Sequence, residues 1–167
     1  MIKNMFVRFT VTLVAILSFW GISTQSLAFD IELPPGVACD FPLGINIGVP
    51  EHRVMKTFYD KEGNPVRFLQ AGEGNLLEFG NLDSGSTISL KTGGSVAQII
   101  PNSDGSETWI NTGHNVVVFF PSDVPAGPAT TLYIGKLVFR LNPSENMIDG
   151  IESFSGKSTD ICAVLEG

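Results

Sequence analysis

The chain has 167 residues, of which 43% are hydrophobic, and a formal net charge of −7 from 10 Lys and Arg against 17 Asp and Glu. Nucleic-acid binding needs clustered Lys and Arg to contact phosphates, and no such cluster occurs, so this class of partner is excluded. A chain of this length is typical of one domain with a sizeable core.

The N-terminal segment is typical of an export signal. Lys3 and Arg8 precede an uncharged, largely apolar run over 9–22, and the small residues Ser26 and Ala28 stand where a signal peptidase cleaves. The run is shorter than the ~20 apolar residues of a membrane-spanning helix. We therefore predict a signal peptide over 1–28, secretion by a bacterial-type route, and no stable membrane insertion of the remaining chain.

The two cysteines, Cys39 and Cys162, lie near opposite ends of the predicted exported chain. In an oxidising compartment such a pair most simply forms a disulfide. Two free thiols are the alternative, and the sequence does not decide whether a bridge forms within one chain. A zinc site is disfavoured because no histidine stands at ligand spacing from either cysteine.

The segment 29–50 is rich in Pro and Gly, and we expect it to be an irregular arm of a single domain over 29–167. From 52 onward, apolar runs alternate with turn-forming clusters, as expected for an antiparallel protein. The expected strands are 52–59, 66–70, 76–79, 87–91, 96–100, 107–110, 115–120, 131–141, 147–154 and 161–165.

Local features refine this pattern. The apolar run 116–120 predicts a central strand that is buried on both faces. Gly105 ends a hairpin turn over 102–105, Gly135 predicts a β-bulge, and the proline-rich segment 121–128 predicts a loop. No helical periodicity is visible after the signal. The fold class is therefore all-β: an antiparallel β-sandwich of jelly-roll or Greek-key type, with a distorted β-barrel as the alternative.

Catalytic and metal-binding patterns are weak. His52 and His114 are isolated from other metal-ligating residues, and the turn 60–64 lacks the alternating ligands of a calcium loop. Ser, His114 and Asp123 offer the residue types of a hydrolytic triad, but the Gly-x-Ser-x-Gly elbow is absent. Four acidic residues offer possible carboxylate pairs for sugar hydrolysis, without a spacing that pairs them: Glu73, Glu78, Asp83 and Glu107. We assign no catalytic residue, metal or cofactor.

A binding function is the other hypothesis. Trp109 is the single tryptophan after the signal, and an exposed aromatic ring is a common anchor for a protein or sugar surface, although a place in the core is the simpler expectation. Together with His114 and with Asp123, which lies in the stiff proline-rich loop 121–128, it forms our candidate ligand-binding set. We expect a non-catalytic extracellular protein that binds a protein or glycan; a small secreted hydrolase acting on glycans or esters is the alternative.

Several motifs together resemble a set of small secreted proteins of actinomycete-like bacteria, and the resemblance covers most of the predicted exported chain. The motifs are Ala38-Cys39-Asp40-Phe41, Gly63-Asn64-Pro65-Val66-Arg67-Phe68, Asn81-Leu82-Asp83-Ser84-Gly85, Thr112-Gly113-His114-Asn115, Asp123-Val124-Pro125-Ala126-Gly127-Pro128 and Gly156-Lys157-Ser158-Thr159-Asp160-Ile161-Cys162. The resemblance implies a signal peptide and a terminal cysteine pair. It implies no activity.

Overall fold

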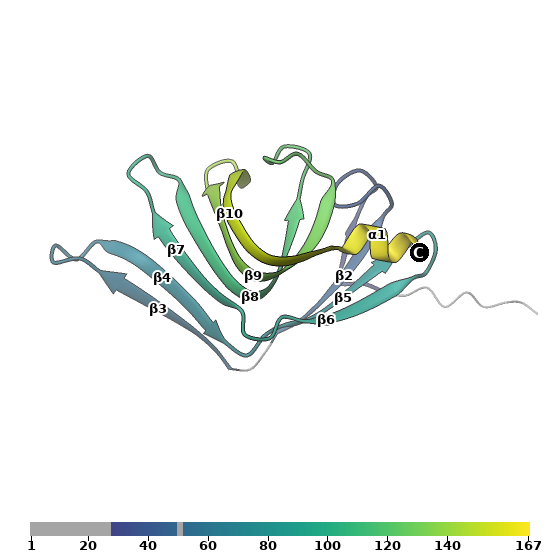
Figure 1. The fold of residues 1–167 in the computed structure, drawn as a ribbon, viewed down its shortest axis with the longest axis horizontal. Coiled ribbons are helices and arrows are strands. Elements are labelled where there is room, and N and C mark those ends of the chain that lie inside the picture. The colour runs from purple at the N-terminus through teal and green to yellow at the C-terminus, as the bar shows by residue number, and fades with distance from the viewer. Residues whose placement is uncertain (1–27, 50–51) are drawn as a thin grey trace, which may run out of the picture.

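The computed structural model describes residues 28–49 and 52–167, so the predicted signal peptide lies outside the described residues except for Ala28. The described chain is built almost entirely from strands (Figure 1). The elements are β1 (Ile31–Leu33), β2 (Leu43–Gly48), β3 (Arg53–Tyr59), β4 (Pro65–Gly72), β5 (Leu76–Asn81), β6 (Thr87–Lys91), β7 (Val96–Pro101), β8 (Glu107–Phe119), β9 (Ala129–Asn142), β10 (Met147–Asp160) and α1 (Ile161–Glu166).

The strands form two antiparallel sheets. The smaller sheet has the order β1-β2-β5-β6, and the larger has the order β10-β9-β8-β7-β4-β3. The chain crosses between the sheets three times, so β2 pairs with β5 although β3 and β4 intervene, and β4 pairs with β7 although β5 and β6 intervene. Each sheet ends at free edges, which confirms the predicted sandwich and removes the barrel alternative for the described part of the chain.

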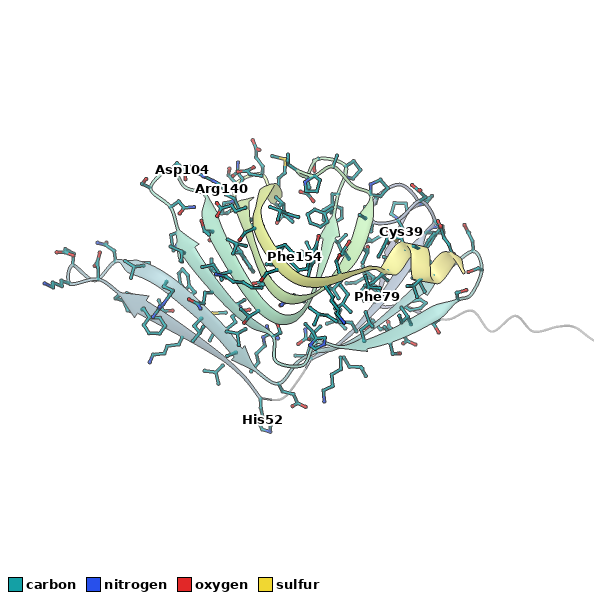
Figure 2. All side chains as sticks on the ribbon, in the orientation of Figure 1. Cys39, His52, Phe79, Asp104, Arg140 and Phe154 are labelled. Atoms are coloured by element: carbon teal, nitrogen blue, oxygen red, sulfur yellow. A yellow bond between two sulfur atoms is a disulfide. The ribbon has the colours of Figure 1, made fainter. Side chains whose placement is uncertain are left out.

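The two sheets enclose a core of apolar side chains, which we call the intersheet core. Its buried members are Ala38, Cys39, Phe41, Leu43, Ile45, Phe79, Leu132, Ile161 and Leu165. Val116 and Val118 of β8 pack against it from the larger sheet, and Phe79 lies in it from the smaller one (Figure 2). Burial of this apolar surface is the main force that holds the sheets together.

A second cluster lies on the opposite face of the larger sheet, and we call it the inner cluster. Its buried members are Val117, Phe119, Leu137, Phe139 and Ile148. Alternate residues of β8 therefore enter different cores, which confirms the prediction of a central strand buried on both faces. Figure 1 shows why a single sheet can enclose side chains: β8, β9 and β10 bend sharply along their length.

The bulge that we predicted at Gly135 is not present, and the sheet bends there without one. This residue pairs in register with Gly113 on β8 and with Gly156 on β10, and the register shifts of β10 lie elsewhere, near Ile148 and Ile151. All three glycines have positive φ. The pattern is a row of glycine kinks, which curves a sheet without inserting a residue. The predicted strands 107–110 and 115–120 are consequently one continuous strand, β8.

Two further predictions were wrong in detail. The arm 29–50 is not irregular throughout, because β1 and β2 form in it and its prolines fall outside both strands. The segment predicted as a strand over 161–165 is helix α1, whose first turn begins at Asp160 with a carboxylate that accepts a hydrogen bond from the Ala163 amide. This helix presents Ile161 and Leu165 to the intersheet core.

Candidate functional site

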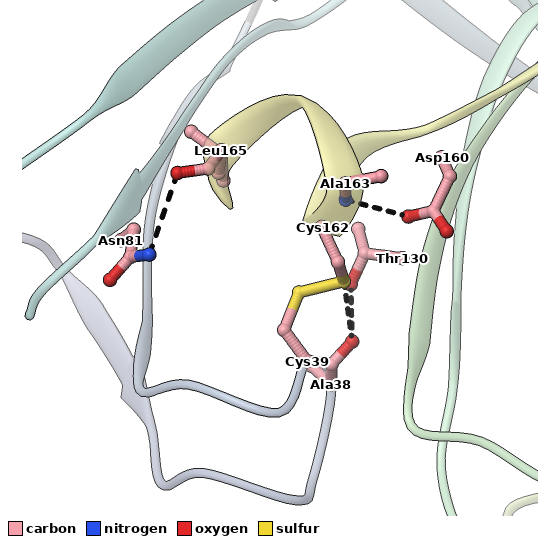
Figure 3. The surroundings of a disulfide bond; sticks show 8 residues. All are labelled: Ala38, Cys39, Asn81, Thr130, Asp160, Cys162, Ala163 and Leu165. Atoms are coloured by element: carbon pink, nitrogen blue, oxygen red, sulfur yellow. Dashed lines mark hydrogen bonds between the residues drawn. A yellow bond between two sulfur atoms is a disulfide. The ribbon is translucent and has the colours of Figure 1, made fainter. Parts of the chain in front are cut away.

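The predicted disulfide is present between Cys39 and Cys162, whose Cα atoms lie 5.6 Å apart. It joins the segment after β1 to helix α1 (Figure 3). Beside it the Thr130 side chain is fully buried, and its hydroxyl donates to the Ala38 carbonyl at 3.0 Å. The bridge is thus part of the intersheet core, where it fixes both ends of the described chain.

Trp109 occupies β8 and is half-buried beside the inner cluster. Its ring stacks on Phe139 at 5.8 Å between centroids, and its Nε1 donates to the Glu107 carboxylate at 2.8 Å. One ring face and the single polar atom of the indole are therefore engaged within the chain. The arrangement is that of a structural tryptophan at the border of a core, and it leaves little of the ring for a ligand.

Asp123 is buried, with 4% of its surface exposed. Its carboxylate accepts hydrogen bonds from the Phe120 amide at 2.6 Å and from the Ile148 amide at 2.8 Å. Val124 adds a backbone bond to the Ile148 carbonyl. Asp123 therefore fastens the loop 121–128 to the start of β10 and has both carboxylate oxygens occupied.

His114 follows the glycine kink on β8, and it lines a hollow of ≈ 160 Å³ at the junction of the two sheets. Its Nδ1 lies 2.9 Å from the Gly93 carbonyl. A carbonyl only accepts, so Nδ1 carries the proton, and no hydrogen bond joins Nε2 to another described residue. The hollow is lined by Arg53, Asn75, Leu77, Thr92, Ser95, His114, Asn115 and Val116.

The three candidate residues do not form one site. Trp109 and His114 are five positions apart on β8, a span of up to about 17 Å, and Asp123 lies beyond the end of that strand. Within 28–49 and 52–167, no group of three His, Cys, Asp or Glu side chains is arranged to hold a metal ion. The turn 60–64 is a plain turn, in which hydrogen bonds from Asn64 lower the pKa of Asp60.

The acidic residues considered for sugar hydrolysis have separate surroundings. Glu73 lies 3.9 Å from Lys91, Glu78 accepts a hydrogen bond from Asn46, and Glu107 is held by Trp109. They lie near or on strands of both sheets. No described hydrogen bond joins one of these carboxylates to another or to His114.

Several exposed apolar side chains lie on one element that sequence reasoning did not single out. The β3–β4 hairpin, Arg53–Gly72, carries Val54, Met55 and Tyr59 at 65, 64 and 63% exposure. β3 is the free edge of the larger sheet, and β4 pairs with β7 only through Phe68–Gln70. The outer half of the hairpin therefore projects into solvent, as Figures 1 and 2 show at the left.

The same hairpin concentrates positive charge. It holds four of the ten Lys and Arg of the chain but only two of its seventeen acidic residues. The Lys56 ammonium and the Arg67 guanidinium lie 5.0 and 4.0 Å from the centre of the Phe58 ring. These cation–π contacts hold both charges on one face of the hairpin. The available signal in the sequence was a local excess of basic over acidic residues in an otherwise acidic chain. The four basic residues are spread along two strands and the turn between them, so they do not form a run that is visible in the sequence.

Comparison with protein families, with curated proteins and with solved structures gives no match. The resemblance to small secreted actinomycete-like proteins stays a prediction. No helix in the described residues is long and apolar enough to cross a membrane.

Proposed function

We propose that this protein is a non-catalytic extracellular binding protein that holds a partner protein through the β3–β4 hairpin. The observation that carries the proposal is the exposure of Val54, Met55 and Tyr59 on an element that covers no core of its own. Exposed apolar side chains grouped on one element of a soluble domain are a mark of an interaction site. The extracellular setting rests on the export-type N-terminus and is supported by the disulfide.

The charge of the hairpin indicates the kind of partner. Met55 and Tyr59 point to one face of β3, whereas Val54, Lys56 and Phe58 point to the other, because successive side chains alternate. A partner that holds the hairpin in a cleft, with one acidic wall and one apolar wall, would match both faces. Lys56 and Arg67 would then steer the encounter, and the apolar side chains would supply most of the affinity.

The hydrolase alternative has one observation in its favour, since His114 lines a hollow that also contains Ser95. The contacts favour binding instead. The Ser95 hydroxyl donates to the Asn115 side chain at 2.7 Å, and Nδ1 of His114 is held by a backbone carbonyl where a triad would place a carboxylate. Assays of ester and glycoside hydrolysis with His114→Ala as control test this alternative directly.

The binding proposal is tested with a double variant, Met55→Thr with Tyr59→Thr, because threonine keeps strand propensity while it removes the apolar surface. The exported chain is immobilised and exposed to the secreted proteins of the source bacterium. Each captured protein is then purified, and its Kd is measured at low and high salt. We expect an acidic protein whose Kd rises with salt and rises at least about tenfold in the double variant.

Val164→Thr is the matched control, because Val164 is also exposed, at 48%, but lies on α1 away from the hairpin. The control variant should bind as the native chain does. Unchanged Kd values in the double variant would overturn the proposal. The proposal would also be overturned if the chain bound a glycan array but no protein, and if that binding were unchanged in the double variant.

A further inference from the structure

The hollow at the sheet junction has the features of a prepared polar site. Thr92, Ser95 and Asn115 are buried in its wall, at 6, 6 and 8% exposure, whereas Arg53 is exposed at its edge. Leu77 adds apolar surface. Buried polar side chains in the wall of a solvent-accessible hollow are common in sites for small polar ligands.

Internal hydrogen bonds hold the wall in place. The Asn115 amide donates to the Thr112 carbonyl at 2.9 Å, and its oxygen accepts from Ser95 at 2.7 Å. The Thr92 hydroxyl donates to the Asn75 carbonyl at 3.2 Å. Since these side chains are already ordered, a ligand would not have to immobilise them.

Three groups in the hollow have hydrogen-bonding capacity that no described residue uses. Arg53 donates one guanidinium N–H to the Asn75 side-chain oxygen at 3.2 Å, and no other hydrogen bond joins its guanidinium or the Asn75 NH₂ group to a described residue. No hydrogen bond joins Nε2 of His114 to another described residue, whereas Nδ1 is engaged by Gly93. No Asp or Glu is among the described lining residues, although acidic residues outnumber basic ones in the whole sequence. The wall therefore combines a cation with neutral donors and acceptors.

We propose that this hollow binds a single sugar acid, with its carboxylate on Arg53. The planar guanidinium matches the two oxygens of a carboxylate, while Nε2 of His114 and the Asn75 amide suit sugar hydroxyls. The volume of ≈ 160 Å³ is below the ~300–1,000 Å³ of sites for larger organic ligands, and it suits one small ring. This site is independent of the partner that the hairpin binds.

The test is a titration of the isotope-labelled exported chain with glucuronate, glucose and inorganic phosphate, followed by NMR. We expect saturable glucuronate shifts in the amides of Thr92, Ser95 and His114. Arg53→Gln should raise the Kd at least about tenfold, because a charge-assisted bidentate contact is lost. Arg53→Lys should weaken binding by less, because it keeps the charge but not the planar fork.

Arg67→Gln is the matched control, because Arg67 lies on the same hairpin with its guanidinium on the Phe58 ring. Arg67→Gln should leave glucuronate binding unchanged. The Met55 and Tyr59 double variant should also leave it unchanged, and this result would distinguish the hollow from the hairpin surface. Equal losses in Arg53→Gln and Arg67→Gln would overturn the proposal, since they would indicate general attraction of anions. Phosphate binding as tight as glucuronate, equal binding of glucose, or no saturable shift would also overturn it.

Discussion

Gly113 on β8 and Gly135 on β9 lie directly opposite each other, and both have positive φ, at 83° and 137°. Gly156 continues the row on β10 with a φ of 135°. A Cβ at Gly135 or Gly156 would collide with a backbone carbonyl of the neighbouring strand, and a Cβ at Gly113 would collide with the Gly94 carbonyl in the loop between β6 and β7. Glycine at these positions therefore permits both the positive φ of the bend and the close approach of neighbouring backbone segments.

Gly135→Ala should lower the free energy of unfolding by at least ~2 kcal/mol, because the new methyl group meets the Ser155 carbonyl and the φ is strained for alanine. Urea unfolding followed by tryptophan fluorescence measures the change. Gly150→Ala is the control on the neighbouring strand, since open space surrounds that position. A Gly135→Ala protein as stable as the control would show that the bend does not depend on glycine.

Reduction of the Cys39–Cys162 bridge should lower the unfolding midpoint. The bridge spans 123 positions of sequence, and for such a loop the chain-entropy model gives up to about 4–5 kcal/mol. Thermal unfolding with and without reductant measures the effect, with thiol titration to confirm reduction. The double variant Cys39→Ala with Cys162→Ala should have the unfolding midpoint of the reduced chain, and reductant should not change that midpoint. An unchanged midpoint in both would contradict the prediction.

Asp123→Asn should destabilise the fold by about 1–3 kcal/mol, because an amide cannot accept from the Phe120 and Ile148 amides with both of its polar atoms. Chemical unfolding gives the free energy, and hydrogen exchange at Ile148 reports the local loss. Asp83→Asn, at an exposed turn, should have little effect. A loss of ligand binding without loss of stability would show that Asp123 acts in recognition, as the sequence first suggested.

Tyr133 should make the fold less stable at high pH. Burial raises the pKa of its hydroxyl above the ordinary 10.0, and a hydrogen bond with Thr131 opposes part of the rise. The unfolded chain then ionises first, so this contribution is complete below about pH 10 and is lost as pH rises toward the folded pKa. Unfolding midpoints from pH 8 to 11 should fall less steeply in Tyr133→Phe, which keeps the edge contact with Phe154. Equal slopes would contradict the assignment.

Local sequence patterns predicted most strands well. The segment 87–91 alternates regularly and is strand β6 with those bounds, and the turn over 102–105 joins β7 to β8 as expected. The bend was hidden because a glycine inside a strand is compatible with a bulge, a kink or a close contact. Only the in-register partners Gly113 and Gly156 show which of these applies.

The candidate site was less predictable. Trp109, His114 and Asp123 were chosen by residue type, and each has a structural contact that could not be read from its neighbours in sequence. Arg53 went unnoticed because its place beside His114 depends on the meeting of β3 and β8, which are 61 positions apart at those residues.

The sequence by itself determined the β class, the positions of most strands and turns, and the availability of one cysteine pair, because these follow from local alternation, turn-forming residues and residue type. Only the tertiary structure decided the pairing of β2 with β5 and of β4 with β7, the bend at the glycine row and the helix at 161–166. It also left the β3–β4 hairpin exposed and brought Arg53 to His114. These features depend on contacts between distant segments, whose energies outweigh local preference.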